Sequence, residues 1–187
     1  MNLHVSLRHH FLVAMPTLNE AFFKRSVIYI CEHQTKGTAG LIINQPMGES
    51  LELVFDQLHL EDPVHAQKNK PLLLGGPVQP ERGFVIHRPF GSWRSSLRLD
   101  DDVTLTTSND IIRAIAHDHG PHDALVALGF VGWEEGQLEK EIMADKWLVC
   151  PYHPALLYDV PFEHRWEQAA KTMGVDMNYF IPGTGHA

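Results

Sequence analysis

The sequence predicts an α+β fold built on mostly antiparallel sheets, and three features of the chain lead to this prediction. Strand-like segments come in groups, helix-like segments concentrate in the second half, and no regular alternation of strand and helix runs through the chain. With 187 residues, of which 44% are hydrophobic, the chain is long enough to bury a substantial core. No internal repeat or low-complexity linker divides it, so we expect one domain over residues 1–187.

In the first half, apolar runs rich in β-branched and aromatic residues alternate with turn signals, which is typical of strands. Segments 26–32 and 39–44 are joined by a short loop containing Gly37, which predicts a hairpin. Residues 50–59 carry apolar side chains at helical spacing and predict an amphipathic helix, whereas the polar stretch 61–70 predicts an exposed loop. The other strands expected up to the middle of the chain are 11–15, 72–74, 83–87, 96–99 and 103–106.

Farther along, the pattern changes to a helical period. A helix is expected after Thr107, which can cap it, with the carboxylate of Asp110 in the first turn. The run 124–131 is apolar without polar alternation, so we expect a central strand that is covered on both faces. Residues 136–145 predict a helix with Met143 among its inward-facing side chains. The last expected elements are a strand over 147–150 and a helix over 162–173.

Charge and composition count against several classes of protein. The formal net charge is −8, with the acidic excess in residues 91–187, and the absence of a basic run opposes direct binding of nucleic acid. The apolar runs are too short to cross a bilayer, and residues 1–16 lack the apolar core of a secretory signal, so we expect a cytoplasmic protein. Cys31 and Cys150 each end an apolar run, which predicts two buried free thiols.

A series of short motifs spans nearly the whole chain. They are Phe11–Pro16, Phe23–His33, Gly40–Pro46, Gly75–Val78, Arg82–His87, Thr106–Ser108, Leu125–Phe130, Gly132–Trp133, Gly136–Glu139 and Gly185–Ala187. In this order they resemble the AlgH/YqgE family of bacterial proteins, although Gln45 stands where lysine is common in that family. The resemblance implies an α+β fold whose sheets curl into a barrel-like core flanked by helices. It implies less about activity, because the family is largely uncharacterised and the label of transcriptional regulator is only sometimes attached to it.

Polar and glycine residues that border the expected strands are the candidates for contact with a ligand or partner. Glycines let a ligand approach the backbone closely, and loops that leave a rigid sheet are where binding residues concentrate. Gly132 would let the chain turn and present Trp133 at a rim, and the alternative is that Trp133 closes one end of the core. The candidates are Arg25, Ser26, Asn44, Gly75, Gly76, Arg82, His87, Thr107 and Trp133.

Known catalytic motifs are missing from the sequence. It contains no phosphate loop, no G-x-S-x-G nucleophile elbow and no H-E-x-x-H metal motif. Cys31 and His33 would point to the same face of a strand, but no third group is visible to orient the histidine. The histidine-rich segment 117–122 is interpreted as a solvated helix end, and metal binding there is left open.

The leading hypothesis is therefore a non-enzymatic binding or regulatory protein, without a cofactor, that acts through a protein or small-molecule partner. The alternative is an enzyme that acts on a small molecule in a pocket near Gly75-Gly76-Pro77 and His87. A third possibility, direct DNA binding, agrees with the regulator label but is opposed by the charge balance.

Overall fold

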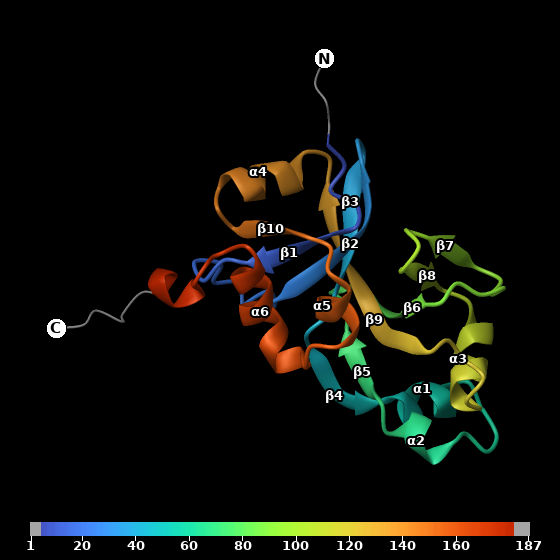
Figure 1. Cartoon of the computed structure of the whole chain (residues 1–187). Coiled ribbons are helices and arrows are strands. Elements are labelled where there is room, and N and C mark those ends of the chain that lie inside the picture. The colour runs from blue at the N-terminus through green and yellow to red at the C-terminus, as the bar shows by residue number, and fades with distance from the viewer. Residues whose placement is uncertain (1–4, 182–187) are drawn as a thin grey trace. The chain divides into compact units, whose positions relative to one another are not determined.

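The computed structural model describes residues 5–181 and divides the chain into two compact units (Figure 1). Of the described residues, 5–44 and 131–181 form the first unit and 45–130 form the second. The division falls inside one long strand, β9 (Asp123–Glu134), which pairs within both units. The prediction of a single domain stays a prediction. The motif Gly185–Ala187 lies outside the described residues.

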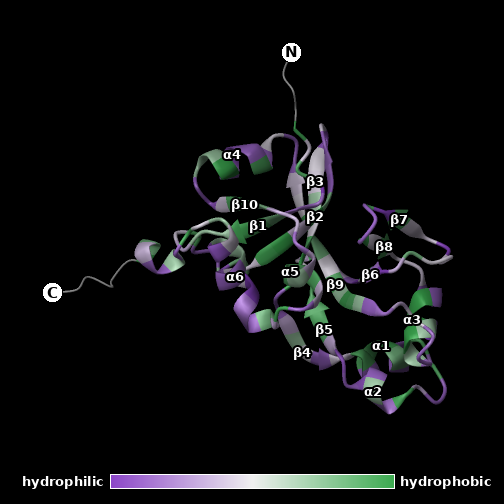
Figure 2. Cartoon of the chain, in the orientation of Figure 1, coloured by the Kyte–Doolittle hydropathy of each residue, from purple (hydrophilic) through white to green (hydrophobic). Residues whose placement is uncertain are grey.

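The first unit is built on an antiparallel sheet in the order β10, β1, β2, β3 and the end of β9. Its other strands are β1 (His10–Ala14), β2 (Val27–Gln34), β3 (Gly37–Ile42) and β10 (Trp147–Pro151). The predicted hairpin is confirmed as β2 and β3. Strands β1 and β2 are apolar along most of their length (Figure 2). Their side chains join Trp133 and Trp147 in one buried cluster, so this unit has a core of its own.

Short helices complete the first unit. They are α4 (Gln137–Met143), α5 (Pro154–Tyr158), α6 (Arg165–Thr172) and the 3-10 turns η1 (Phe162–His164) and η2 (Met177–Phe180). The prediction that Met143 faces inward is wrong, because its side chain is 80% exposed. The buried face of α4 runs through Leu138 and Ile142, which are four positions apart, and Met143 lies well off that line at about 100° per residue.

The second unit has its own sheet, in which residues 123–130 of β9 lie between β5 and β6. The strands are β4 (Pro46–Ser50), β5 (Pro71–Leu74), β6 (Val78–Arg88), β7 (Ser96–Arg98) and β8 (Thr104–Thr106). Among the strands of residues 5–181, only β5 and β9 pair in parallel, so the predicted α+β class with mostly antiparallel sheets is confirmed. Strand β4 was not predicted, because its side chains are nearly all exposed and give no apolar signal.

Three helices belong to the second unit: α1 (Leu51–Gln57), α2 (His65–Lys68) and α3 (Asn109–Ala116). The prediction of a loop over 61–70 is wrong in part, because α2 lies within it. The predicted cap at Thr107 is also wrong. The amide of Thr107 still donates to the carbonyl of Ser95, so the strand pairing extends one residue farther and Ser108 takes the cap position. Apolar faces of α1 and α3 pack in one core cluster with β5, β6 and β9.

Candidate functional site

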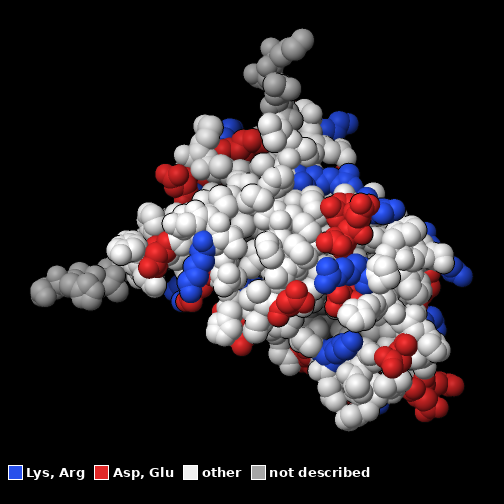
Figure 3. All heavy atoms as spheres, viewed as in Figure 1, with Lys and Arg blue, Asp and Glu red and all other residues white. Residues whose placement is uncertain are grey.

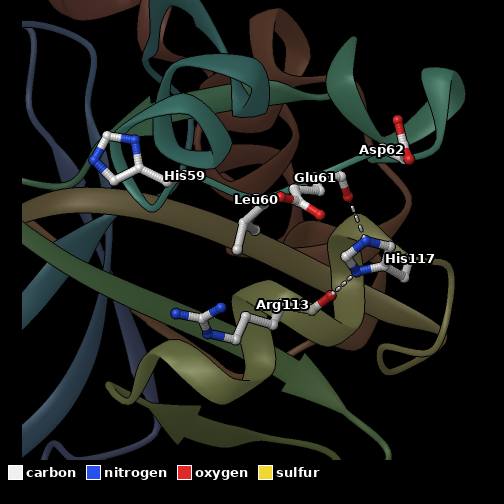
Figure 4. A pocket seen from close by; sticks show the side chains of 6 residues that line it. All are labelled: His59, Leu60, Glu61, Asp62, Arg113 and His117. Carbon is white, nitrogen blue, oxygen red and sulfur yellow. Dashed lines mark hydrogen bonds between the residues drawn. The ribbon is translucent and has the colours of Figure 1, made fainter.

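The second unit contains a pocket of about 560 Å³ between the turn that follows α1 and the C-terminal half of α3 (Figure 4). It is lined by His59, Leu60, Glu61, Asp62, Arg113 and His117. The turn is tied back to α1, since the amide of Leu60 donates to the carbonyl of Phe55. His59 and Asp62 have φ of 52° and 46°, a left-handed conformation that non-glycine residues adopt at a cost. Such strain often collects at ligand sites.

The imidazole of His117 holds the two walls of this pocket together. Its Nδ1 lies 2.9 Å from the carbonyl oxygen of Arg113, and its Nε2 lies 2.8 Å from the carbonyl oxygen of Glu61. Carbonyl oxygens only accept hydrogen bonds, so both contacts are satisfied only when both ring nitrogens carry protons. The carbonyl of Glu61, then that of Arg113 and the nearby charge of Asp62 raise the pKa of His117 above its usual value. The geometry and the direction of this pKa shift both favour the imidazolium form of the ring.

Opposite charges in the pocket lining remain unpaired. Among residues 5–181, neither the guanidinium of Arg113 nor the carboxylate of Glu61 makes a hydrogen bond or an ion pair, and the ring of His59 makes none. In Figure 4 the side chains of Leu60 and Glu61 face the pocket above Arg113, whereas Asp62 points away from them. The pocket thus offers one cation, one anion and one apolar side chain whose binding capacity the protein does not use.

The structure places His87 away from this pocket and out of reach of solvent. Its side chain is fully buried, with Nδ1 3.1 Å from the carbonyl of Pro89 and Nε2 2.8 Å from Oγ1 of Thr106. The carbonyl requires a proton on Nδ1, so the hydroxyl of Thr106 donates to Nε2. Burial lowers the pKa of His87, which favours this neutral form. His87 is therefore hydrogen-bonded within the protein through both ring nitrogens, and its role as a ligand or partner contact stays a prediction.

The backbone of Gly75 and Gly76 lies against strand β9, and a role of these glycines in ligand binding stays a prediction. The amide of Gly75 donates to the carbonyl of Leu128 at 2.8 Å. Gly129 has φ of 74°, and a Cβ atom there would collide with the carbonyl oxygen of Gly76. Close packing of chain on chain therefore explains why glycine is needed at this junction.

The other candidates of the second unit lie apart from one another. Arg82 is exposed, donates to Oε1 of Gln79 and lies over the ring of Phe84. Thr107 is fixed by its backbone at the edge of the sheet. Neither residue lines the pocket described above.

Three candidates of the first unit are brought together by hydrogen bonds. The side chain of Asn44 accepts from the amide of Val27 and donates to the carbonyl of Arg25, both at 2.9 Å. Ser26 is fully buried and donates to the carbonyl of Phe23. Arg25, with φ of 58°, lies with its guanidinium 4.5 Å from the ring centre of Trp166. These contacts fix a turn, and a role for them in ligand binding stays a prediction.

Trp133 is only 6% exposed and packs edge-on against Trp147 in the core of the first unit, with ring centres 6.0 Å apart. Its indole N–H and that of Trp147 both donate to the same Glu141 oxygen, at 2.9 and 2.8 Å. This placement favours the interpretation of Trp133 as a core residue over that of a partner contact.

A second pocket, of about 550 Å³, lies in the first unit and is lined by Ser6, His33, Gln34, Thr35, Glu135, Gly136 and Glu139. The amide of Leu7 donates to Nδ1 of His33, which leaves the ring proton on Nε2 to bond Oε1 of Glu139 at 2.9 Å. The side chain of His33 is only 8% exposed. Both ring nitrogens are therefore occupied by the protein itself.

The remaining chemical candidates find little support in the described part of the chain. Burial raises the pKa of Cys31 to about 12, so its thiol stays protonated at neutral pH, and Cys150 is likewise buried with a raised pKa. Residues 5–181 contain no cluster of three or more His, Cys, Asp or Glu side chains that could hold a metal ion. On the face shown in Figure 3, Lys and Arg side chains are interspersed with Asp and Glu.

Among residues 5–181, no helix is long and apolar enough to span a membrane.

Sequence reasoning missed most of the pocket. It assigned His117 to the end of α3 but gave no role to Arg113 or to the segment 59–62. His59 is not a usual turn residue, and Asp62 belongs to the stretch 61–70 that was predicted only as an exposed loop. The bond between His117 and Glu61 joins residues 56 positions apart, which no local pattern reveals.

Comparison with known proteins adds a consistent set of matches. A family model described as "AlgH-like" matches residues 11–178. The UPF0301 protein of Legionella pneumophila (strain Corby) is 58% identical over 97% of each chain. The UPF0301 protein of Saccharophagus degradans is 47% identical over 98% of this chain and 90% of its own.

Two solved structures show the same fold. The solution structure of the AlgH protein from Pseudomonas aeruginosa superimposes with a TM-score of 0.81 at 40% identity, covering 100% of this chain and 99% of that one. A crystal structure of a Corynebacterium diphtheriae protein gives 0.73 at 20% identity, over 97% and 94% of the two chains, which supports the fold alone.

Proposed function

The chain belongs to the AlgH-like family, and we propose that it is a non-catalytic binding protein whose small charged ligand occupies the pocket between residues 59–62 and α3. The observation that carries this proposal is an unpaired Arg113 and an unpaired Glu61 in one pocket. The ring of His117 links the two sides of this pocket by hydrogen bonds to the carbonyls of Arg113 and Glu61. Unpaired charges that face a hollow are free to be satisfied by a ligand.

The same geometry argues against His117 as a catalytic acid or base. A histidine that acts as general base needs a free lone pair, and one that acts as general acid needs a proton directed at the substrate. His117 offers neither, because both of its N–H groups point at backbone carbonyls. Its role is to hold the pocket walls at a fixed distance.

The alternative of an enzyme near Gly75-Gly76-Pro77 and His87 has weaker support. His87 is fully buried, and its ring nitrogens face the carbonyl of Pro89 and the hydroxyl of Thr106. A substrate could not reach this ring without unfolding the strand pairing around it. Gly75 and Gly76 are used for packing against β9.

A regulatory role would then operate through the bound ligand and a protein partner, in the cytoplasm, rather than through direct contact with DNA. The net charge of −8 supports this, because a DNA-binding surface must neutralise phosphates with basic side chains. A salt titration with duplex DNA tests this point, since electrostatic binding would weaken steeply as the salt concentration rises.

Protein-observed NMR against a library of small charged metabolites tests the proposal. We expect one chemical class to shift the amide resonances of residues 59–62 and 113–117, and we expect the compound to be recovered unchanged after prolonged incubation. Conversion of the compound by the wild type would overturn the non-catalytic assignment. Failure of every compound to move these resonances would overturn the choice of pocket.

A further inference from the structure

We propose that the ligand of this pocket is a zwitterion, a small molecule that carries one carboxylate and one ammonium group as a free α-amino acid does. This inference rests on the proposed function and specifies the chemistry of its ligand. It follows from the charge balance of the pocket, from the absence of an ion pair between its two opposite charges and from the apolar side chain of Leu60 in its lining.

The carboxylate of such a ligand has a partner in Arg113. The guanidinium group presents paired N–H donors that match the two oxygens of a carboxylate, and this geometry makes bidentate bonds strong and specific. Arg113 projects from α3 into the pocket and has no hydrogen-bond or ion-pair partner among residues 5–181. His117 cannot serve as a second donor, because the carbonyls of Arg113 and Glu61 already take both of its protons.

The ammonium group has a partner in the carboxylate of Glu61. This side chain lines the same pocket, and the described residues offer it no cation at ion-pair distance, although Arg113 faces the same hollow. Two opposite charges that line one pocket without bridging leave room for a ligand that carries the complementary pair. The backbone carbonyl of Glu61 is occupied by His117, so the carboxylate is the acceptor that remains.

The charges of the lining oppose a simple anion. With His117 protonated, Arg113 and His117 contribute two positive charges, and Glu61 and Asp62 contribute two negative ones. A simple anion would be repelled by the two carboxylates, and a simple cation by the two positive side chains. A ligand with no net charge but with one carboxylate and one ammonium group is attracted by both sets of side chains. Leu60 supplies an apolar contact for the carbon skeleton of the ligand. A volume of about 560 Å³ lies in the usual range for small-molecule sites.

The test is a set of NMR titrations of the full chain with L-leucine, and with acetate and methylammonium as the two half-ligands. We expect L-leucine to shift residues 59–62 and 113–117, and each half-ligand to bind about tenfold more weakly or worse, because one charge-assisted contact is lost. Glu61→Gln should weaken L-leucine binding about tenfold and leave acetate binding unchanged or stronger. Arg113→Leu should weaken both L-leucine and acetate.

Matched controls come from exposed residues of the same unit. Glu81→Gln and Arg94→Leu remove the same charges outside the pocket, and we expect them to leave L-leucine binding unchanged. Amide spectra of all variants check that the fold is kept.

The outcomes separate the ligand class from the proposed function. If acetate or inorganic phosphate binds as tightly as L-leucine, and Glu61→Gln does not weaken binding, the ligand is an anion and the inference is overturned while the pocket stands. If L-leucine does not shift these resonances but other compounds of the metabolite library do, the inference of a zwitterionic ligand is overturned while the proposed function stands. If no compound of either set shifts them, the proposed function falls as well.

Discussion

Two pockets of almost equal volume, one in each unit, differ in what their polar groups already do. In the first unit, His33 accepts a hydrogen bond from Leu7 and donates one to Glu139, so both of its ring nitrogens are satisfied. The lining there holds the carboxylate of Glu135, unpaired among the described residues, but no Lys or Arg opposite it. In the second unit, His117 binds two carbonyls, while Arg113 and Glu61 stay unpaired. The difference teaches that volume and residue types do not identify a binding site. What identifies it is the set of donors and acceptors that folding leaves unused.

The core of the first unit should be the most sensitive point, because it depends on buried packing. Trp133→Ala removes a core indole that also anchors Glu141 of α4, so we expect a loss of about 3–5 kcal/mol in the free energy of unfolding, measured by urea denaturation. Phe90→Ala is the control, since Phe90 is 54% exposed and its removal should cost less than about 0.5 kcal/mol. A loss at Trp133 no larger than that of the control would show that the indole is a surface contact.

The unpaired Arg113 should show the reverse behaviour. Arg113→Ala should weaken ligand binding about tenfold or more, because the ligand loses a charge-assisted partner. Its free energy of unfolding should change by less than about 0.5 kcal/mol, since the side chain is exposed and unpaired. Isothermal titration and urea denaturation of the same preparation measure both quantities. A variant that is destabilised with unchanged affinity would mean that Arg113 is structural.

The bond between His33 and Glu139 should have a moderate effect on stability and none on ligand binding. Glu139→Gln replaces a charged acceptor by a neutral one, and because Glu139 is half exposed we expect a loss of about 1 kcal/mol or less. Glu135→Gln, in the same pocket, should be neutral and serves as the control. Weaker binding of the ligand in Glu139→Gln would place the site in the first unit instead.

The smallest expected effect is the pH dependence contributed by His117. Its pKa is raised in the folded state, so its stabilising contribution is complete below the usual value of 6.5 and is lost as the pH rises through the raised pKa. Urea midpoints of the wild type should therefore fall, relative to those of His117→Gln, as the pH rises above 6.5. Parallel pH profiles for the two proteins would contradict the description of this ring as an imidazolium.

Local patterns in the sequence predicted most of the elements. Helix α3 follows from the helical period of its residues, and the hairpin of β2 and β3 and strand β9 follow from their own apolar runs. Strand β4 and helix α2 escaped because their side chains are largely exposed and polar. Elements held by pairing with distant segments leave little trace in their own composition.

The candidate site was harder to predict than the fold, for a physical reason. Strand-end residues such as His87 and Asn44 attracted attention as polar groups beside apolar runs, and the structure uses both in internal hydrogen bonds. Arg113 and Glu61 looked like ordinary surface charges on a helix and a loop. Their significance depends on lying in one pocket without pairing, which is a property of the folded chain rather than of any segment.

The most direct test of the account is one two-dimensional amide NMR titration with L-leucine, read at both pockets at once. The account predicts that resonances of residues 59–62 and 113–117 shift in a saturable way, while those of residues 33–35 and 135–139 stay in place. It also predicts that Arg113→Ala moves the titration to L-leucine concentrations about tenfold higher or more, and that the control Arg94→Ala leaves it unchanged. Shifts confined to residues 33–35 and 135–139, or shifts that persist unchanged in Arg113→Ala, would contradict the claim that unused charges mark the binding site.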